Sequence, residues 1–220
     1  MKIGSIISIF LFSCLLETGN VNAQTFRKGS LLLSLTEGST YAHFTTSDNS
    51  TSPAKITDGN ICGDRDPIIL EYGLSNKWGI GINMGGDILH VNPTSFYNVH
   101  TTATQLITSE LSLEANYHFL VTKKFDLSAC GSLGFASVHF EGNEGDGGAV
   151  HDYNAGGGII RLSAKARYYF FRRFGVLCIL SAYSSSCTPD ADKDNSIQKQ
   201  TTTRISGYSF EFGLCYRILK

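Results

Sequence analysis

Eight charged side chains fall between apolar residues, and these are the residues of the sequence that could do chemistry. They are four acids and four bases: Glu71, Glu110, Glu114 and Glu211 against Arg161, Lys165, Arg167 and Arg217. Carboxylates near basic groups can transfer protons, so one interpretation is acid–base catalysis or a proton path. The other is mutual ion pairing, which we favour because an unpaired buried ion is costly and the two sets match in number. The pattern therefore predicts a structural charge network and no catalytic residue.

Other polar residues give weaker signals. Five histidines could bind a metal ion or sense pH, but no two share a short ligand spacing: His43, His90, His100, His139 and His151. The acids of the glycine-rich stretch 141–152 lack the regular spacing of a calcium loop. We therefore expect no metal site and no cofactor.

The charged residues lie on segments that alternate with period two. Around Glu110 and Glu114, the apolar positions are Leu111, Leu113, Ala115, Tyr117 and Phe119. Period two is the period of a β-strand. Six segments alternate in this way, namely 68–74, 78–84, 111–119, 125–135, 160–170 and 208–218. With 29–36 and 174–182 they make eight predicted strands, although 174–182 is apolar on both faces and its register stays open.

The predicted connections alternate in length. Three are short, at 75–77, 120–124 and 171–173, and four are long and polar, at 45–66, 87–104, 141–158 and 183–203. An up-and-down transmembrane barrel with both termini in the periplasm has this layout. Aromatic residues gather near the short turns, as one interfacial girdle requires, and Phe44, Phe135, Phe140, Tyr183 and Tyr208 could form the other. The fold class predicted is all-β, an eight-stranded antiparallel up-and-down transmembrane β-barrel.

The N-terminus has the features of an export signal. Lys2 precedes an apolar stretch at 3–16, and Val21-Asn22-Ala23 offers small residues for cleavage. Residues 1–23 are therefore predicted to be a signal peptide and 24–220 an outer-membrane β-barrel domain. With 42% hydrophobic residues, 17% charged residues and a net charge of -1, the chain shows no electrostatic signature of nucleic-acid binding.

In such a barrel the apolar set faces lipid and the charged set faces the lumen. Eight strands leave an interior that side chains just fill, so paired ions can plug it. Inward glycines would give the long side chains room: Gly73, Gly79, Gly81, Gly134 and Gly213. We expect no open diffusion channel.

Five cysteines remain after the leader, an odd number that cannot be fully paired within one chain. Cys62 and Cys187 lie in the first and last predicted long connections. Closing the barrel makes these connections neighbours, so a disulfide between the two cysteines is a hypothesis.

Two strands carry a family resemblance. The opening run Arg27-Lys28-Gly29-Ser30-Leu31-Leu32-Leu33 and the closing strand at 207–218 resemble those of the small eight-stranded outer-membrane barrels of Gram-negative bacteria, the OmpX-like and OmpA-barrel-like proteins. The resemblance implies outer-membrane lipid as surroundings and insertion by the outer-membrane assembly machinery, which recognises the last strand. That strand usually ends in an aromatic residue, whereas this chain ends Ile218-Leu219-Lys220.

Some barrels of this resemblance are lipid A-modifying enzymes, which would need a His-x-Ser pair on a strand. His118 and His139 are not followed by serine at that spacing, so a non-enzyme is expected. The function predicted is a structural or surface-interaction role, with four outward loops that could meet an unknown surface ligand. Alternatives are a narrow porin for small solutes, a lipid-modifying enzyme and a soluble secreted β-barrel. We expect a monomer in the bacterial outer membrane.

Overall fold

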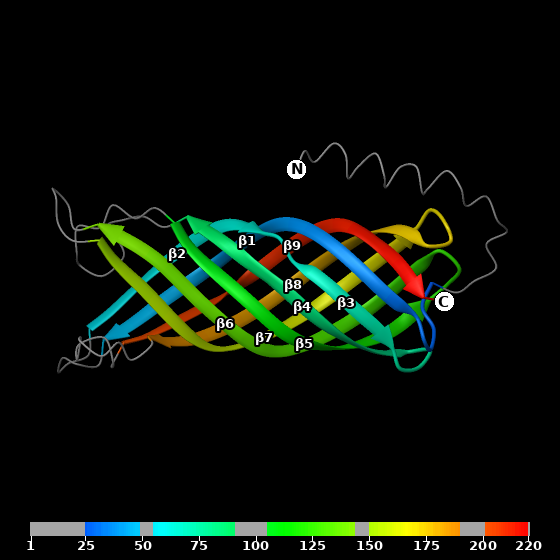
Figure 1. Cartoon of the computed structure of the whole chain (residues 1–220), viewed down its shortest axis with the longest axis horizontal. Coiled ribbons are helices and arrows are strands. Elements are labelled where there is room, and N and C mark those ends of the chain that lie inside the picture. The colour runs from blue at the N-terminus through cyan, green and yellow to red at the C-terminus, as the bar shows by residue number, and fades with distance from the viewer. Residues whose placement is uncertain (1–24, 49–54, 91–104, 144–149, 190–200, 220) are drawn as a thin grey trace.

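The computed structural model describes residues 25–48, 55–90, 105–143, 150–189 and 201–219, and these form a closed antiparallel sheet (Figure 1). Its strands are β1 (Leu31–Asp48), β2 (Lys55–Arg65), β3 (Ile68–Gly73), β4 (Trp78–His90), β5 (Gln105–Val121), β6 (Phe125–Asn143), β7 (Val150–Tyr169), β8 (Phe174–Pro189) and β9 (Thr201–Leu219). Each strand pairs with its sequence neighbours, and β1 pairs with β9 to close the ring. In the part of the chain that is described, no helix is long and apolar enough to cross a membrane.

The nine strands occupy eight positions, because β2 and β3 share one. Both pair with β1 on one side and with β4 on the other. The interruption falls at Asp66 and Pro67, and proline has no N–H with which to continue the hydrogen-bond ladder. The carbonyl of Pro67 still accepts a hydrogen bond from the N–H of Thr36, at 3.1 Å, which holds the two parts in line. The predicted eight-stranded up-and-down barrel is confirmed.

The predicted long connections contain more residues than those in the structure, because the strands extend into them. Most of 45–66 is strand, since β1 runs to Asp48 and β2 begins at Lys55, and β6 to β9 likewise extend into the predicted loops. The longest strand, β7, has 20 residues, whereas about 9–11 tilted residues cross a bilayer. The barrel therefore extends well beyond a bilayer on the side away from the short turns. We call this the upper half, and the half that carries the short turns the lower half.

In the lower half, apolar side chains point outward. Leu113 is 69% exposed, Leu162 is 64% exposed and Phe212 is 55% exposed. The charged residues between them are buried inside the ring. This is the arrangement that a bilayer requires, and it is the one predicted.

In the upper half the pattern is inverted, and apolar side chains fill the interior. The buried cluster consists of Ala42, Phe44, Ile61, Leu89, Leu106, Ala136, Val138, Ala155, Ile159, Tyr183, Cys187 and Ile205. Their outward neighbours change along the barrel axis. Beside the lower members of the cluster they are still apolar, such as Tyr41, Ile88 and Phe135, and beside the higher members they are polar, such as His43 and Arg204. Phe44 and Tyr183 were therefore wrongly predicted in the upper girdle, whereas Phe135 and Tyr208 do point outward. The side chain of Phe140, the fifth predicted member, lies outside the described part of the structure. Above the bilayer the outside is water, so apolar residues turn inward as in a soluble protein.

The structure also settles the register of the strand at 174–182. Leu177 and Ile179 are buried inside the ring, at 0% and 2% exposure, and Leu180 points outward. Lower in the same region, Leu177 and Ile179 join Ile69, Tyr169 and Cys215 in a second buried apolar cluster.

The segment before β1 closes the lower end. The side chain of Phe26 is completely buried and stacks on the ring of His118, with 3.5 Å between ring centroids and 11° between planes. Hydrogen bonds from Thr25 to the carbonyls of Thr122 and Phe125 hold the segment across the opening. Gly29, with φ +81°, makes the turn from this segment into β1, in the left-handed region that favours glycine.

Candidate functional site

All eight charged residues predicted for the lumen lie inside the ring. The most exposed of them is Glu110, at 6%. They come from β3, β5, β7 and β9 and separate into layers along the barrel axis. Four buried charged residues outside the predicted set join them, namely Arg65, Asp87, His118 and Asp126.

The upper cluster centres on the guanidinium of Arg65, at the end of β2. It donates to Glu110 at 2.8 Å, to Glu211 at 3.1 Å and to Asp87 at 3.3 Å. Arg161 donates to the same Oε2 of Glu110 at 2.7 Å. One arginine thus ties together strands β2, β4, β5 and β9, and its planar fork suits several carboxylates at once.

The middle layer is an ion pair between Glu114 and Lys165. Lys165 Nζ lies 2.6 Å from Glu114 Oε2, and both side chains are buried. Asn83 donates to the other oxygen of Glu114 at 3.3 Å. Gly81 lies beside this pair, and a Cβ there would approach the backbone oxygen of Leu70 to 2.8 Å.

The lower cluster joins His118, Arg167, Glu71 and Asp126. Arg167 donates to Glu71 at 2.5 Å and to Asp126 at 3.0 Å. His118 Nδ1 lies 2.7 Å from Asp126 Oδ1, and its Nε2 lies 2.8 Å from Glu71 Oε1. An ionised carboxylate only accepts hydrogen bonds, so with Glu71 and Asp126 both ionised the two ring nitrogens of His118 would both donate and the ring would be the imidazolium.

Two arginines also lie over aromatic rings. Arg161 lies 4.6 Å from the ring centroid of Tyr183, and Arg217 lies 5.1 Å from that of Tyr169. Such contacts stabilise a desolvated cation. The ring of Tyr169 is one of the contacts of Arg217, the lowest of the predicted bases, inside the barrel.

Charge is balanced over the described lumen. The buried acids are Glu71, Asp87, Glu110, Glu114, Asp126 and Glu211, and the buried cations are Arg65, Arg161, Lys165, Arg167, Arg217 and the imidazolium of His118. Six acidic and six basic side chains are therefore buried in the described lumen when His118 is counted as a cation. Arg217 lies over the ring of Tyr169.

The four residues outside the predicted set escaped sequence reasoning for two reasons. His118 and Asp126 occupy the inward positions of their strands, so the alternation itself could have identified them. Arg65 and Asp87 lie where β2 and β4 leave the apolar band. Arg65 lies between Asp64 and Asp66, and Asp87 lies between Gly86 and Ile88. Without an apolar residue on each side, the alternation does not identify either residue as inward.

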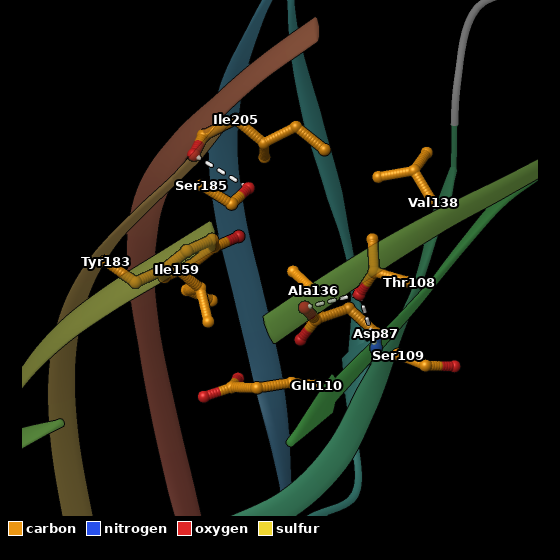
Figure 2. A pocket seen from close by; sticks show the side chains of 10 residues that line it. All are labelled: Asp87, Thr108, Ser109, Glu110, Ala136, Val138, Ile159, Tyr183, Ser185 and Ile205. Carbon is orange, nitrogen blue, oxygen red and sulfur yellow. Dashed lines mark hydrogen bonds between the residues drawn. The ribbon is translucent and has the colours of Figure 1, made fainter. Parts of the chain in front are cut away.

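A small pocket lies in the lumen directly above the upper ion cluster. Figure 2 shows the pocket between Asp87, Glu110, Ile159 and Tyr183, and its volume is about 10 Å³, roughly that of one water molecule. The Tyr183 hydroxyl is buried and has no hydrogen-bond partner among the described residues. A single water molecule in the pocket would satisfy it.

The predicted disulfide between Cys62 and Cys187 is contradicted, because both are free thiols. Cys62 lies on β2 and points outward, whereas Cys187 lies on β8 and points into the lumen. Strands β1 and β9 separate them in the ring. Among the residues that the structure describes, no group of three or more His, Cys, Asp or Glu could hold a metal ion.

Comparison with known proteins relates this geometry to solved barrels. No protein-family model and no curated sequence matches the chain. The outer membrane protein OprG from Pseudomonas aeruginosa aligns with a TM-score of 0.52 and 12% identity, over 88% of this chain and 97% of OprG. The chain has the fold of the small outer-membrane β-barrels. The outer membrane protein AlkL, whose structure was determined in lipid bilayers, aligns with a TM-score of 0.51 and 10% identity, over 93% of this chain and 97% of AlkL.

Proposed function

We propose that this protein is an integral barrel of the bacterial outer membrane with a closed lumen, and that it acts as a structural or surface-interaction protein through its upper rim. The observation that carries the proposal is the filled interior. From the lower end upward, the lumen contains the Phe26 plug, three layers of paired ions and an apolar layer.

Each layer opposes the passage of solutes for a different reason. The paired ions occupy the lumen with side chains that would be costly to separate. The apolar layer above them, which includes Phe44, Leu89 and Leu106, resists wetting. A channel would require both layers to move.

The upper half has the properties of a rigid support. Its apolar interior packs as in a soluble protein, and the outer surface near the rim includes exposed polar residues such as Asn60, His43 and Arg204. It carries the ends of β1, β4, β6 and β8, from which the four outward connections start. Segments held on a rigid scaffold are well suited to recognition.

A catalytic role has little support in the lumen. The imidazole of His118 has both ring nitrogens against carboxylates, so neither can act as a base for a nucleophile. In the upper cluster, the guanidinium groups of Arg65 and Arg161 likewise donate to carboxylates. We therefore propose that the protein is not an enzyme.

Conductance in planar bilayers tests the closed lumen. Purified, folded protein should give no steady single-channel current, and a porin of known conductance serves as the positive control. The variant Phe26→Ala should also give none, because the ion layers and the apolar layer remain. Steady current from the wild-type protein would refute the proposal and favour the narrow channel.

A second measurement addresses the enzyme alternative. Lipid A from cells that express the protein and from cells that lack it should give the same mass spectrum. A lipid A species that appears only in cells that express the protein would overturn the non-catalytic assignment. If cells that express the Glu110→Gln variant also contain it, the reaction takes place outside the ion network of the lumen.

A further inference from the structure

The lower rim of the barrel carries a ring of positive charge. It consists of Arg27, Lys28, Lys77, Lys123, Lys124, Arg172 and Arg173, which we call the basic collar. Lys28, Lys77 and Lys124 are exposed, and Arg172 is half-buried. These residues come from the segment before β1 and from all three short turns, so the collar surrounds the whole opening (right-hand end of Figure 1).

Backbone hydrogen bonds fix the collar to the barrel. The carbonyl of Lys77 accepts from the N–H of His118, that of Lys124 from Tyr169, and that of Arg173 from Arg217, each at 2.8 Å. Each turn is thereby tied to the next strand beyond its own hairpin. The N–H of Lys28 donates to the Asn76 side chain at 3.1 Å, which ties the N-terminal segment to the first turn.

No acid lies among the collar residues. The described segments 25–30, 74–77, 119–125, 170–174 and 217–219 contain neither Asp nor Glu. The nearest acids, Glu71 and Asp126, face the lumen at 1% and 0% exposure and are bound by Arg167 and His118. The described residues of these segments therefore carry positive formal charge only.

The collar lies directly at the edge of the aromatic girdle. Lys77 precedes Trp78, and Arg172 follows Phe171, and these two aromatic side chains are exposed on the outer surface. Girdles of aromatic residues, tryptophan above all, flank the apolar band of a membrane barrel at the level of the lipid headgroups. The cations thus lie at headgroup depth and do not project as a separate domain into the aqueous phase.

From this placement, we propose that the basic collar binds anionic phospholipid headgroups of the periplasmic leaflet. A leaflet encircles the barrel, as the collar does, whereas a soluble anionic protein would meet only one side of it. Clusters of Lys and Arg at an interface attract anionic lipids, and the attraction weakens with salt.

The test is a comparison of lipid association in vesicles. The folded barrel is reconstituted in phosphatidylcholine with trace spin-labelled phosphatidylglycerol or spin-labelled phosphatidylcholine, and the motionally restricted fraction of each label is measured. The wild type should favour phosphatidylglycerol by roughly fivefold at low salt, and the preference should fall towards one in ~0.5 M NaCl.

Two matched variants separate charge from folding. The variant with Lys28→Gln, Lys77→Gln, Lys124→Gln and Arg172→Gln should lose most of the preference. The variant with Lys28→Arg, Lys77→Arg, Lys124→Arg and Arg172→Lys keeps the charge and should retain it. A heat-dependent gel shift confirms that both are folded. No preference in the wild type, or an unchanged preference in the glutamine variant, would overturn the proposal. These outcomes do not depend on conductance.

Discussion

The ring of Phe26 lies flat against the imidazole of His118, across the lower opening of the barrel. A residue just after the predicted cleavage position thus covers the lowest ion cluster. The stacked pair separates Glu71, Asp126 and Arg167 from the solvent at the lower end, since Phe26 is completely buried and His118 is too. Removing either partner should therefore affect the stability of the whole cluster.

Phe26→Ala should destabilise the folded barrel by about 3–5 kcal/mol, because it leaves a cavity and exposes the cluster to water. Urea unfolding in vesicles, followed by the fluorescence of Trp78, the single tryptophan, gives the measurement. Phe26→Leu should cost less, since it retains much of the volume. Equal stability of the alanine variant and the wild type would show that the segment does not seal the barrel.

Glu114→Gln should cost about 3–5 kcal/mol, because it leaves the Lys165 ammonium buried without its carboxylate partner. Glu114→Leu combined with Lys165→Leu should recover most of this loss, since no unpaired charge remains. Urea unfolding of the single and double variants measures the coupling. Additive losses would mean that the pair does not interact.

Gly79→Ala should be destabilising by about 1–3 kcal/mol. A Cβ at this position would lie 2.5 Å from Glu71 Oε1 and 3.2 Å from Phe26 Cζ, and the Glu71 carboxylate is held by His118 and Arg167. Gly131→Ala is the matched control, because a Cβ there would meet only Leu162, at 3.8 Å. Similar effects at both positions would argue that strand propensity, and not lumen space, decides.

Glu37→Leu should stabilise the barrel by about 1 kcal/mol, because the carboxylate faces the bilayer. Glu37 is exposed on β1, six residues beyond Leu31, and pairs with Phe212 on β9. This places it about 15 Å from the lower end of a band about 25 Å tall. Urea unfolding in vesicles is the measurement, with Glu37→Gln expected in between. A loss of stability would instead indicate a favourable contact for Glu37.

Cys62 should be the cysteine that a membrane-impermeant maleimide labels on intact cells. It points outward from β2 in the upper half, whereas Cys130, Cys187 and Cys215 are buried. Cys178 is half-buried and pairs with Ala166 and Phe212 within the apolar band, where the bilayer shields it. Mass analysis of the labelled protein should show one adduct, and Cys62→Ser should abolish it. Labelling that requires a permeabilised outer membrane would reverse the orientation proposed for the barrel.

The sequence by itself determined the lower half of the barrel. A bilayer demands apolar side chains outside, and a narrow lumen demands paired polar ones, so residues such as Leu113 and Glu114 must alternate along each strand. Strand number, inward face and the eight-residue charge network follow from that single constraint. The strands at 68–74 and 208–218 could be predicted from the sequence for this reason.

Tertiary structure decided the rest, because the contrast between faces changes once the strands leave the bilayer. Above the apolar band the outside is water, so the upper strands resemble polar loops in sequence although they form sheet. Only ring closure brings Arg65 to Glu211, 146 residues away along the chain, and places Cys62 and Cys187 on opposite faces. Likewise, no local pattern indicates that Phe26 folds back onto His118. These contacts depend on distant strands meeting, and that information lies in the closed barrel.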